Sequence, residues 1–350
     1  MNGGVSVLIC CHNSAKRLPE TLRHLASQQV REGLAWEIVV IDNASTDDTA
    51  ATAARYWPAS AQAPLRVVSE RQAGLSHARI RGIQEARYDI ISFIDDDNWV
   101  STDWVQRVNA IFADHPEVGA AGGRIEAVCE IAPPDWFEPL KSHYAVGQQH
   151  PQSGDITDIP GTMLCGAGLN LRTAAARKLF EDGFVFMMTG RKGNRLLTGE
   201  DTELCFALRS SGWRFWYDDG LLLRHFIPKE RLEWDYAVRL LRGMGASSAY
   251  FVLYLCALKA PPFESYPKWK MSWLFQTTKA AWQLTRFALA HPAACLQPTE
   301  GFLPTLKFER MKLNLASWWA LRGRYRELQE EIRHAPWVKD HVRPAEIKSL

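Results

Sequence analysis

Acidic side chains stand at the points where predicted buried strands end. Asp95, Asp96 and Asp97 come directly after one apolar run, and Asp42 closes another. Residues two apart on an extended chain face the same way, so Asp95 and Asp97 can converge on one ligand. Carboxylate oxygens at the mouth of a sheet suit Mg²⁺ or Mn²⁺ that bridges phosphates. Asp42 lies where a carboxylate could accept hydrogen bonds from a base or a ribose.

A plainer alternative for the acidic run is helix capping. Asp96, Asp97 and Asn98 would then cap a helix that starts near Thr102, a position where such side chains are common. The apolar strand that leads into the run and the second strand that ends in Asp both favour ligand binding instead.

The segments that must position these side chains alternate between two periodicities. Continuous apolar strands separated by helices indicate a parallel sheet covered on both faces. Ligands bind such doubly wound sheets beyond the carboxyl ends of the strands. The expected strands are 5–11, 37–41, 65–69 and 89–94, and the expected helices are 15–28, 46–56 and 76–86.

Beyond residue 118 the pattern is looser. We expect a strand at 118–128, a long loop at 130–160, a strand at 165–171 with a helix at 172–180, a helix at 200–209, short strands at 213–217 and 221–226, and helices from Leu232 onwards. The expected fold class is therefore α/β, a doubly wound, mostly parallel sheet with a helical C-terminal extension. The expected domains are a nucleotide-binding catalytic domain at 1–230 and a helical, basic region at 231–350.

Charge divides the chain into two parts. The formal net charge is +2 overall, made of −7 in residues 1–220 and +9 in residues 221–350. The small overall charge argues against a dedicated nucleic-acid binder. The basic, Trp-containing C-terminal third suits an anionic surface such as a membrane. Within it, the apolar stretch 249–258 is either a buried helix or an interfacial one, and it is too short to span a bilayer.

The cysteines bear on location. The chain has seven cysteines and no CxxC pair, which indicates a reducing compartment. The first residues run straight into a strand-like segment without a basic start, so no secretory signal is visible. The expected location is the cytoplasm, and the basic region leaves open a peripheral attachment to the inner face of the cell membrane.

Five short motifs, in this order and at this spacing, resemble those of the family 2 glycosyltransferases, which have the GT-A fold. The resemblance covers about residues 5–245, and two of the five motifs are the metal-binding DxD pattern and a later Glu-Asp pair. The motifs are Cys10–Asn13, Ile41–Asp47, Gly74–Arg79, Asp95–Asp97 and Gly199–Asp201.

The resemblance implies a metal-dependent, inverting transferase that moves a sugar from a nucleoside-diphosphate sugar to a glycan or lipid-linked acceptor in polysaccharide biosynthesis. It assigns Asp201 as the general base, with Glu200 as the alternative or as a group that orients the acceptor. Both acids could instead be ordinary first-turn residues of a helix, and His225 could be a structural histidine. The implied donor-binding residues are Cys11, Asn13, Asp42, Gly74, Arg79, Asp95 and Asp96, and the implied ligands of Mg²⁺ or Mn²⁺ are Asp97, Asp95 and His225.

The chain departs from the family pattern at two places. Ile80 stands where the family frequently has Asn, so this side chain is missing at the nucleotide. The Gln-x-x-Arg-Trp motif of processive members is absent, and residues 239–243 hold the nearest basic segment. Together with the lack of predicted membrane spans, this argues against a processive polysaccharide synthase.

Two other functions compete. A sugar-phosphate nucleotidyltransferase would favour a Gly-rich, basic loop after the first strand, where this chain has Cys11–Ser14. A non-catalytic nucleotide- or glycan-binding subunit is a third alternative, against which the intact Asp97 and Asp201 speak. The glycosyltransferase interpretation requires Asp42, Asp95 and Asp97 to gather around one cation, within a few ångströms of the Glu-Asp pair.

The glycine-containing segment 166–168 and two tryptophans could each serve binding or packing. The segment 166–168 lacks the third glycine of a dinucleotide fingerprint, so we expect it to give close backbone approach beside the donor sugar. Trp213 and Trp216 could stack on acceptor sugars, although core packing is the ordinary role of such residues.

Overall fold

The computed structural model describes residues 2–159, 163–188, 199–257, 267–296 and 299–339. The chain forms two compact units, and each is described by itself. The first unit holds Met1–Ile131, Tyr144–Glu181 and Trp213–Pro228, and the second holds Ala132–His143, Asp182–Gly212 and Lys229–Leu350. Compared with the expected division at residue 230, residues 132–143 and 182–212 group with the C-terminal helices.

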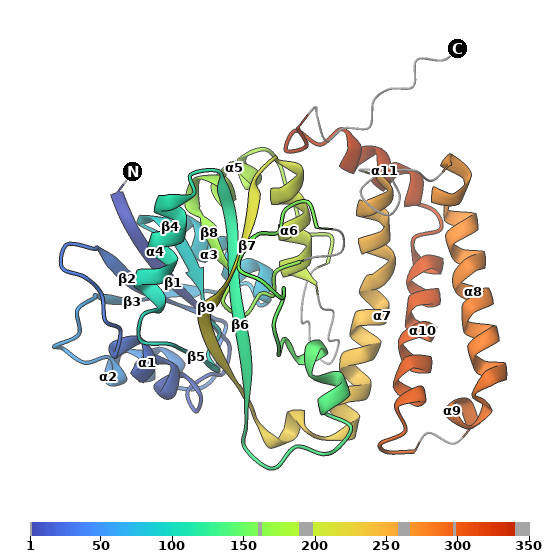
Figure 1. Ribbon diagram of the computed structural model, residues 1–350, viewed down its shortest axis with the longest axis horizontal. Coiled ribbons are helices and arrows are strands. Elements are labelled where there is room, and N and C mark those ends of the chain that lie inside the picture. Colours follow the sequence, from blue (N-terminus) through green and yellow to red (C-terminus); the bar gives the residue numbers. More distant parts are fainter. Residues whose placement is uncertain (1, 160–162, 189–198, 258–266, 297–298, 340–350) are drawn as a thin grey trace. The chain divides into compact units, whose positions relative to one another are not determined.

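The first unit is built on a nine-stranded sheet with the order β3-β2-β1-β4-β8-β6-β9-β5, in which β7 also pairs with β9 (Figure 1). The pairs β1–β2, β1–β4 and β2–β3 are parallel, and β8 enters antiparallel between β4 and β6. The strands are β1 Asn2–Cys11, β2 Trp36–Asn43, β3 Leu65–Glu70, β4 Tyr88–Phe93, β5 Asn98–Val100, β6 Val118–Cys129, β7 Gly154–Asp155, β8 Asn170–Arg172 and β9 Arg214–Ile227.

Helices cover both faces of this sheet, as continuous apolar strands require. Val7 and Ile9 of β1 belong to a core cluster that includes residues of α1 and α4. Leu8 points to the opposite face, where its Cδ1 atom leaves no room for a Cβ at Gly82 of α3. The helices are α1 Leu18–Ala26, α2 Thr49–Tyr56, α3 Leu75–Glu85, α4 Trp104–Asp114 and α5 Thr173–Glu181.

The parallel core brings the carboxyl ends of its strands to one edge. Cys11 at the end of β1 lies opposite Asp42 at the end of β2. The amide of Ile94, just after β4, donates to the carbonyl of Leu8 in β1 at 3.0 Å. The expected fold class is confirmed, and the edge on which ligands of such sheets bind carries the acidic residues.

The later strands differ from the sequence expectation. The two short strands expected at 213–217 and 221–226 are one strand, β9, which pairs with β6 across a register shift between Gly123 and Arg124. The strand expected at 165–171 is reduced to β8. The expected loop 130–160 contains the 3₁₀ helix η1, Glu138–Tyr144, and the short strand β7, which pairs with β9.

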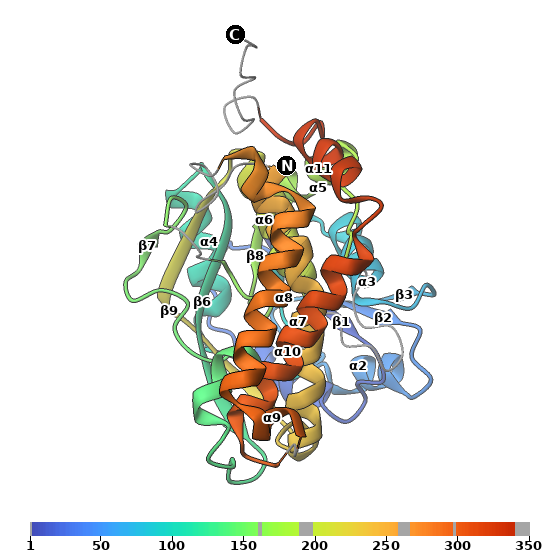
Figure 2. The same ribbon diagram turned by 90° about the vertical axis from the view of Figure 1, so that its right-hand side faces the viewer.

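The second unit is helical. Helix α10 packs against α7 and α8, and α11 packs against α7 (Figures 1 and 2). Its elements are α6 Glu200–Ser210, the 3₁₀ turns η2 Lys229–Arg231 and η3 Lys268–Met271, α7 Trp234–Ala257, α8 Trp273–Ala290, α9 Pro292–Leu296, α10 Leu303–Ala320 and α11 Tyr325–Arg333.

Helix α7 decides between the two alternatives for the apolar stretch 249–258. Ala249, Leu253 and Tyr254 are buried, and the Tyr254 ring stacks on Phe206 of α6 with 5.7 Å between ring centres. This stretch is therefore a core helix, although its last residue lies outside the described ones. By length and composition α7 could cross a membrane, but 56% of its apolar window is buried, as in the core helix of a globular domain.

Candidate functional site

The acidic run forms a tight turn between β4 and β5. The amide of Asp95 donates to Oδ1 of Asn98 at 3.1 Å, and Nδ2 of Asn98 donates to Oδ1 of Asp97 at 3.1 Å. The capping alternative is wrong, because β5 follows the turn and the next helix, α4, has Asp103 at its N-cap. Asn98, which the sequence analysis considered only as a cap, orders the two acidic residues.

The three carboxylates of the turn have different surroundings. Asp96 forms an ion pair with Arg17 at 2.6 Å, and its carbonyl accepts from Oγ1 of Thr21 in α1. It therefore has a partner within the protein and ties the turn to α1. Burial, followed by the charge of Asp97, raises the pKa of Asp95, against the opposing charges of Arg79 and His225. A cation beside Asp95 and Asp97 would remove this penalty.

His225 is brought to the turn by strand pairing. Residues Asn98 of β5 and His225 of β9 lie opposite each other. The Nε2 atom of His225 lies 3.6 Å from Oδ1 of Asp97, and its Nδ1 lies 3.0 Å from the carbonyl of Tyr144. When Nδ1–H donates to that carbonyl, Nε2 presents a lone pair toward a carboxylate oxygen, an arrangement that suits a shared cation.

Asp42 stands apart from these groups. Its Oδ1 is buried and has no hydrogen-bond partner within the described chain, so it can accept a hydrogen bond from a ligand. In the sheet, β1 separates β2 from β4, which places their ends about 10 Å apart. No three His, Cys, Asp or Glu side chains among the described residues lie close enough together to hold a metal ion. The expected gathering of Asp42, Asp95 and Asp97 around one cation is therefore not found.

The loops after β1 and β2 are fastened to each other. Asn13 has a positive φ of 53°, and its Oδ1 accepts from the amide of Thr46 at 2.8 Å. Cys11 is buried, and burial raises the pKa of its thiol well above the ordinary value. The geometry shows Asn13 bracing a loop and Cys11 packing in the core.

Asn43, to which sequence reasoning gave no role, shapes the start of α3. Its Oδ1 accepts from the amide of Gly74 at 2.8 Å, and its Nδ2 donates to the carbonyl of Gln72 at 2.7 Å. Gly74 has φ of 137°, which only glycine adopts readily. Arg79, one turn further on, is buried with its guanidinium over the ring of Phe93 at 5.7 Å. The signal was available, since Asn directly follows the strand-end Asp42.

The Glu-Asp motif lies in the second unit. Glu200 and Asp201 occupy the first turn of α6, with Glu200 buried and Asp201 half-buried. The preceding Gly199 has φ of 124°, and a Cβ there would lie 2.4 Å from Cζ of Phe251. Close approach to α7 therefore requires glycine at this position. The expected proximity of Glu200 and Asp201 to the turn of the first unit stays a prediction.

Glu203, which sequence reasoning missed, holds the start of α6. Its carboxylate accepts from the amides of Met187 at 2.6 Å and Met188 at 3.0 Å, and from the hydroxyl of Tyr254 at 2.7 Å. Burial raises the pKa of Glu203 to about 7 in spite of these donors. The only sequence signal was a third acidic residue in an otherwise apolar helix.

For Gly168, Trp213 and Trp216 the structure shows contacts within the protein, which favour a packing role. A Cβ at Gly168 would lie 2.9 Å from Cη2 of Trp104, so the close approach here is to a buried ring. Trp216 stacks on His115 with 3.8 Å between ring centres, and Trp213 lies against Gly119.

Comparisons with known proteins point to one family. The sequence model described as glycosyl transferase family 2 matches residues 6–165. The glucosyl-dolichyl phosphate glucuronosyltransferase of Haloferax volcanii is 24% identical over 173 residues, which are 49% of this chain and 53% of that protein. The undecaprenyl-phosphate 4-deoxy-4-formamido-L-arabinose transferase of Pseudomonas aeruginosa is 31% identical over 93 residues, 27% of each chain. The match thus spans about half of these curated relatives or less.

A solved structure was also found. The crystal structure of S. aureus TarS 1–349 in complex with UDP-GlcNAc aligns with a TM-score of 0.47 at 15% identity, covering 93% of this chain and 92% of that one.

Proposed function

We propose that the protein, whose residues 6–165 match the model of glycosyl transferase family 2, is a metal-dependent, inverting and non-processive glycosyltransferase. It moves a sugar from a nucleoside-diphosphate sugar to a hydroxyl of a glycan or lipid-linked acceptor in polysaccharide biosynthesis. The observation that carries the proposal is the buried group of Asp95, Asp97 and His225 at the carboxyl edge of a parallel sheet.

The donor lies along this edge. The buried Oδ1 of Asp42 accepts a hydrogen bond from the base or ribose, which supplies the partner that the atom lacks within the described chain. The amide of Gly74, which donates to Asn43, and the guanidinium of Arg79 lie at the start of α3, next to the same edge. Arg79 offsets part of the negative charge of the donor diphosphate.

A divalent cation such as Mg²⁺ or Mn²⁺ would bind here together with the donor, because no three of the described His, Cys, Asp or Glu side chains could hold it by themselves. Asp97, Asp95 and His225 would hold it, with the remaining positions filled by diphosphate oxygens and water. Mg²⁺ is bound in this way, through one or two carboxylates and substrate phosphates, which agrees with the lack of a complete protein cage among the described residues. When bound, the cation neutralises the charge that grows on the leaving diphosphate.

The acceptor hydroxyl needs a base within hydrogen-bond reach. Asp201 is half-buried on the first turn of α6 and takes this role, while the buried Glu200 orients the acceptor. Two of the relatives carry dolichyl phosphate or undecaprenyl-phosphate in their names, which supports a lipid-linked acceptor.

A lipid-linked acceptor agrees with exposed side chains of the second unit. We define the aromatic-basic residues as Trp269, Trp282 and Trp319, which are 59–60% exposed, together with the cations that lie over their rings. Lys270 lies 5.5 Å from the centre of the Trp269 ring, Arg286 5.3 Å from Trp282, and Arg322 5.0 Å from Trp319. Exposed Trp rings beside cations suit the interface of an anionic bilayer. We therefore include in the proposal a cytoplasmic protein that attaches peripherally to the inner face of the cell membrane.

Release of nucleoside diphosphate tests the proposal. Wild-type protein, Asp97→Ala and Asp201→Ala are incubated with several nucleotide sugars, an acceptor extract and Mn²⁺. Asp103→Ala is the matched control, since Asp103 is a half-buried acid of the first unit that pairs with Arg107. We expect Asp97→Ala to weaken donor binding and Asp201→Ala to keep donor affinity but lose turnover.

The competing functions give different outcomes. A nucleotidyltransferase consumes a nucleoside triphosphate and a sugar phosphate and releases pyrophosphate, and a non-catalytic subunit binds the nucleotide sugar without any turnover. Either result, or equal activity in all four proteins, would overturn the proposal.

A further inference from the structure

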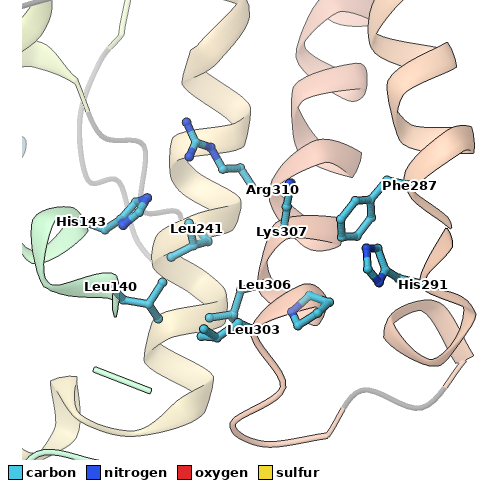
Figure 3. Close-up of a pocket in the computed structure, with 10 residues that line it drawn as sticks. Leu140, His143, Leu241, Phe287, His291, Leu303, Leu306, Lys307 and Arg310 are labelled. Carbon is cyan, nitrogen blue, oxygen red and sulfur yellow. The ribbon is translucent and has the colours of Figure 1, made fainter. Parts of the chain in front are cut away.

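A pocket of about 410 Å³ lies in the second unit, between η1, α7, α8 and α10 (Figure 3). Leu140 of η1, Leu241 of α7 and Leu303 and Leu306 of α10 form apolar walls. Its size falls in the range of pockets that hold small organic ligands. None of the proposed donor, metal or base residues lines it.

The same pocket has a cationic side. Lys307 and Arg310 lie three residues apart on α10 and therefore on one face of that helix. Neither forms an ion pair within the part of the chain that the structure describes, whereas Lys312 of the same helix pairs with Glu309 at 2.7 Å. The Nζ atom of Lys307 lies 5.1 Å from the centre of the Phe287 ring, which holds it at the pocket wall.

Among the residues that the structure describes, no acidic side chain lines the pocket to balance these charges. The other titratable groups there are His143 and His291. Burial, and then the charge of Arg310, lower the pKa of His143, so this ring is neutral at pH 7. The positive charge of Lys307 and Arg310 is thus left for a ligand.

We propose that this pocket binds the phosphate end of an aliphatic phosphate monoester, that is, a lipid phosphate. A phosphate monoester carries about −1.5 to −2 charges at pH 7, which matches the two cations on α10. The apolar walls match the first part of an aliphatic chain. This lipid phosphate is distinct from an acceptor that offers a sugar hydroxyl, so the binding site stands without the proposed function.

The surface next to the pocket continues the apolar character. Leu289 of α8 and Leu296 of α9 are each 79% exposed, and both helices pack against α10. Exposed apolar side chains are thus present on α8, which lines the pocket, and on α9, which packs against α8 and α10.

Calorimetric titration without nucleotide sugar or metal tests the site. The probes are decyl phosphate below its micelle concentration, decanol and inorganic phosphate. Because each buried methylene contributes about fourfold in affinity, decyl phosphate should bind at least a hundredfold more tightly than inorganic phosphate. It should also bind at least tenfold more tightly than decanol. If decanol binds as tightly as decyl phosphate, the pocket is a non-specific apolar site. If inorganic phosphate binds as tightly as decyl phosphate, the pocket is a site for the free ion. Either result overturns the proposal.

Variants locate the binding. Lys307 and Arg310 are exposed, so Lys307→Gln and Arg310→Gln should fold normally and should each weaken decyl phosphate about tenfold. Lys312→Gln is the control on the same helix and should leave the affinity unchanged. If all three variants bind alike, the pocket is not the site. Donor turnover is measured separately, so a failure of binding and a failure of transfer are distinguishable.

Discussion

The Nε2 atom of His225 lies 3.6 Å from Oδ1 of Asp97, and both side chains are buried. The two residues are more than a hundred positions apart, and the pairing of β5 with β9 brings them together. The carbonyl of Tyr144 fixes the other nitrogen of the ring. The histidine is therefore oriented before any ligand binds, as the ligating imidazoles of metal sites usually are.

Two replacements of His225 separate its two contacts. Asn can keep a donor near the Tyr144 carbonyl but loses the group at Nε2, whereas Gln can place an amide near Nε2. We expect His225→Asn to weaken Mn²⁺ binding in the presence of nucleoside diphosphate 10- to 100-fold, with thermal stability near that of the wild type. Calorimetric titration of Mn²⁺ measures this, with His24→Asn on α1 as the control. Unchanged Mn²⁺ affinity in His225→Asn would remove this residue from the metal site.

The base assignment makes a prediction about kinetics. Asp201→Asn removes the proton acceptor without changing the size of the side chain, so turnover should fall about 10²- to 10⁴-fold, and the Kd of the donor should stay within about twofold. Asp235→Asn is the control, because Asp235 is an exposed acid in the first turn of α7. If Glu200→Gln loses turnover and Asp201→Asn does not, the two roles are exchanged. If both variants turn over normally, the base lies elsewhere.

The first four strands and three helices could be predicted because each carries its own periodicity. Their carboxyl-end residues then meet at one edge, since a parallel sheet allows no other arrangement. The convergence of Asp95 and Asp97 on one ligand stays a prediction, and its premise of an extended chain is wrong, because both residues lie in the turn after β4. The error about Asp42 arose because strand order, which puts β1 between β2 and β4, cannot be read from local sequence.

The misjudged features depend on partners distant in the chain. Asp218, Asp219 and Gly220 resemble a turn between two strands, but they form an irregularity within β9, which pairs with β6 on both sides of it. Residues 182–212 group with the C-terminal helices because Glu203 and Phe206 contact Tyr254 of α7. Such contacts leave no periodic pattern in the sequence. For the same reason the pairing of Asn98 with His225 could not be predicted.

Glu203 gives the second unit a dependence on pH. Its side chain is fully buried, and its pKa rises from the ordinary 4.5 to about 7. Between these values the folded chain holds a proton on Glu203 that the unfolded chain has lost, so stability falls as the pH rises through this range. Relative to Glu203→Gln, the wild type should lose about 2–3 kcal/mol of unfolding free energy between pH 5 and pH 8.

Urea unfolding at four pH values measures this difference. Glu327→Gln is the control, since Glu327 is an exposed residue of α11 and should show no such dependence. The groups that face Glu203 are Glu200, whose charge also raises the pKa, and Tyr254, whose hydroxyl donates to it. A difference between wild type and Glu203→Gln that stays constant with pH would contradict the prediction.

The aromatic-basic residues predict binding to anionic membranes. In a flotation assay the wild type should rise with vesicles that contain phosphatidylglycerol and stay at the bottom with phosphatidylcholine alone. Each cation near an anionic surface contributes about 1 kcal/mol, so replacing Lys270, Arg286 and Arg322 by Gln should weaken binding about a hundredfold. Salt should weaken the wild type in the same direction, because exposed charges are screened. The matched control is Tyr56→Ala with Arg55→Gln, an exposed aromatic-cation pair of the first unit at 5.2 Å. Wild-type protein that stays at the bottom with anionic vesicles, or a control that binds as weakly as the triple variant, would refute the membrane assignment.

Concentration-dependent dimers that disappear in the triple variant would instead assign the aromatic-basic residues to a contact with a second copy of the chain.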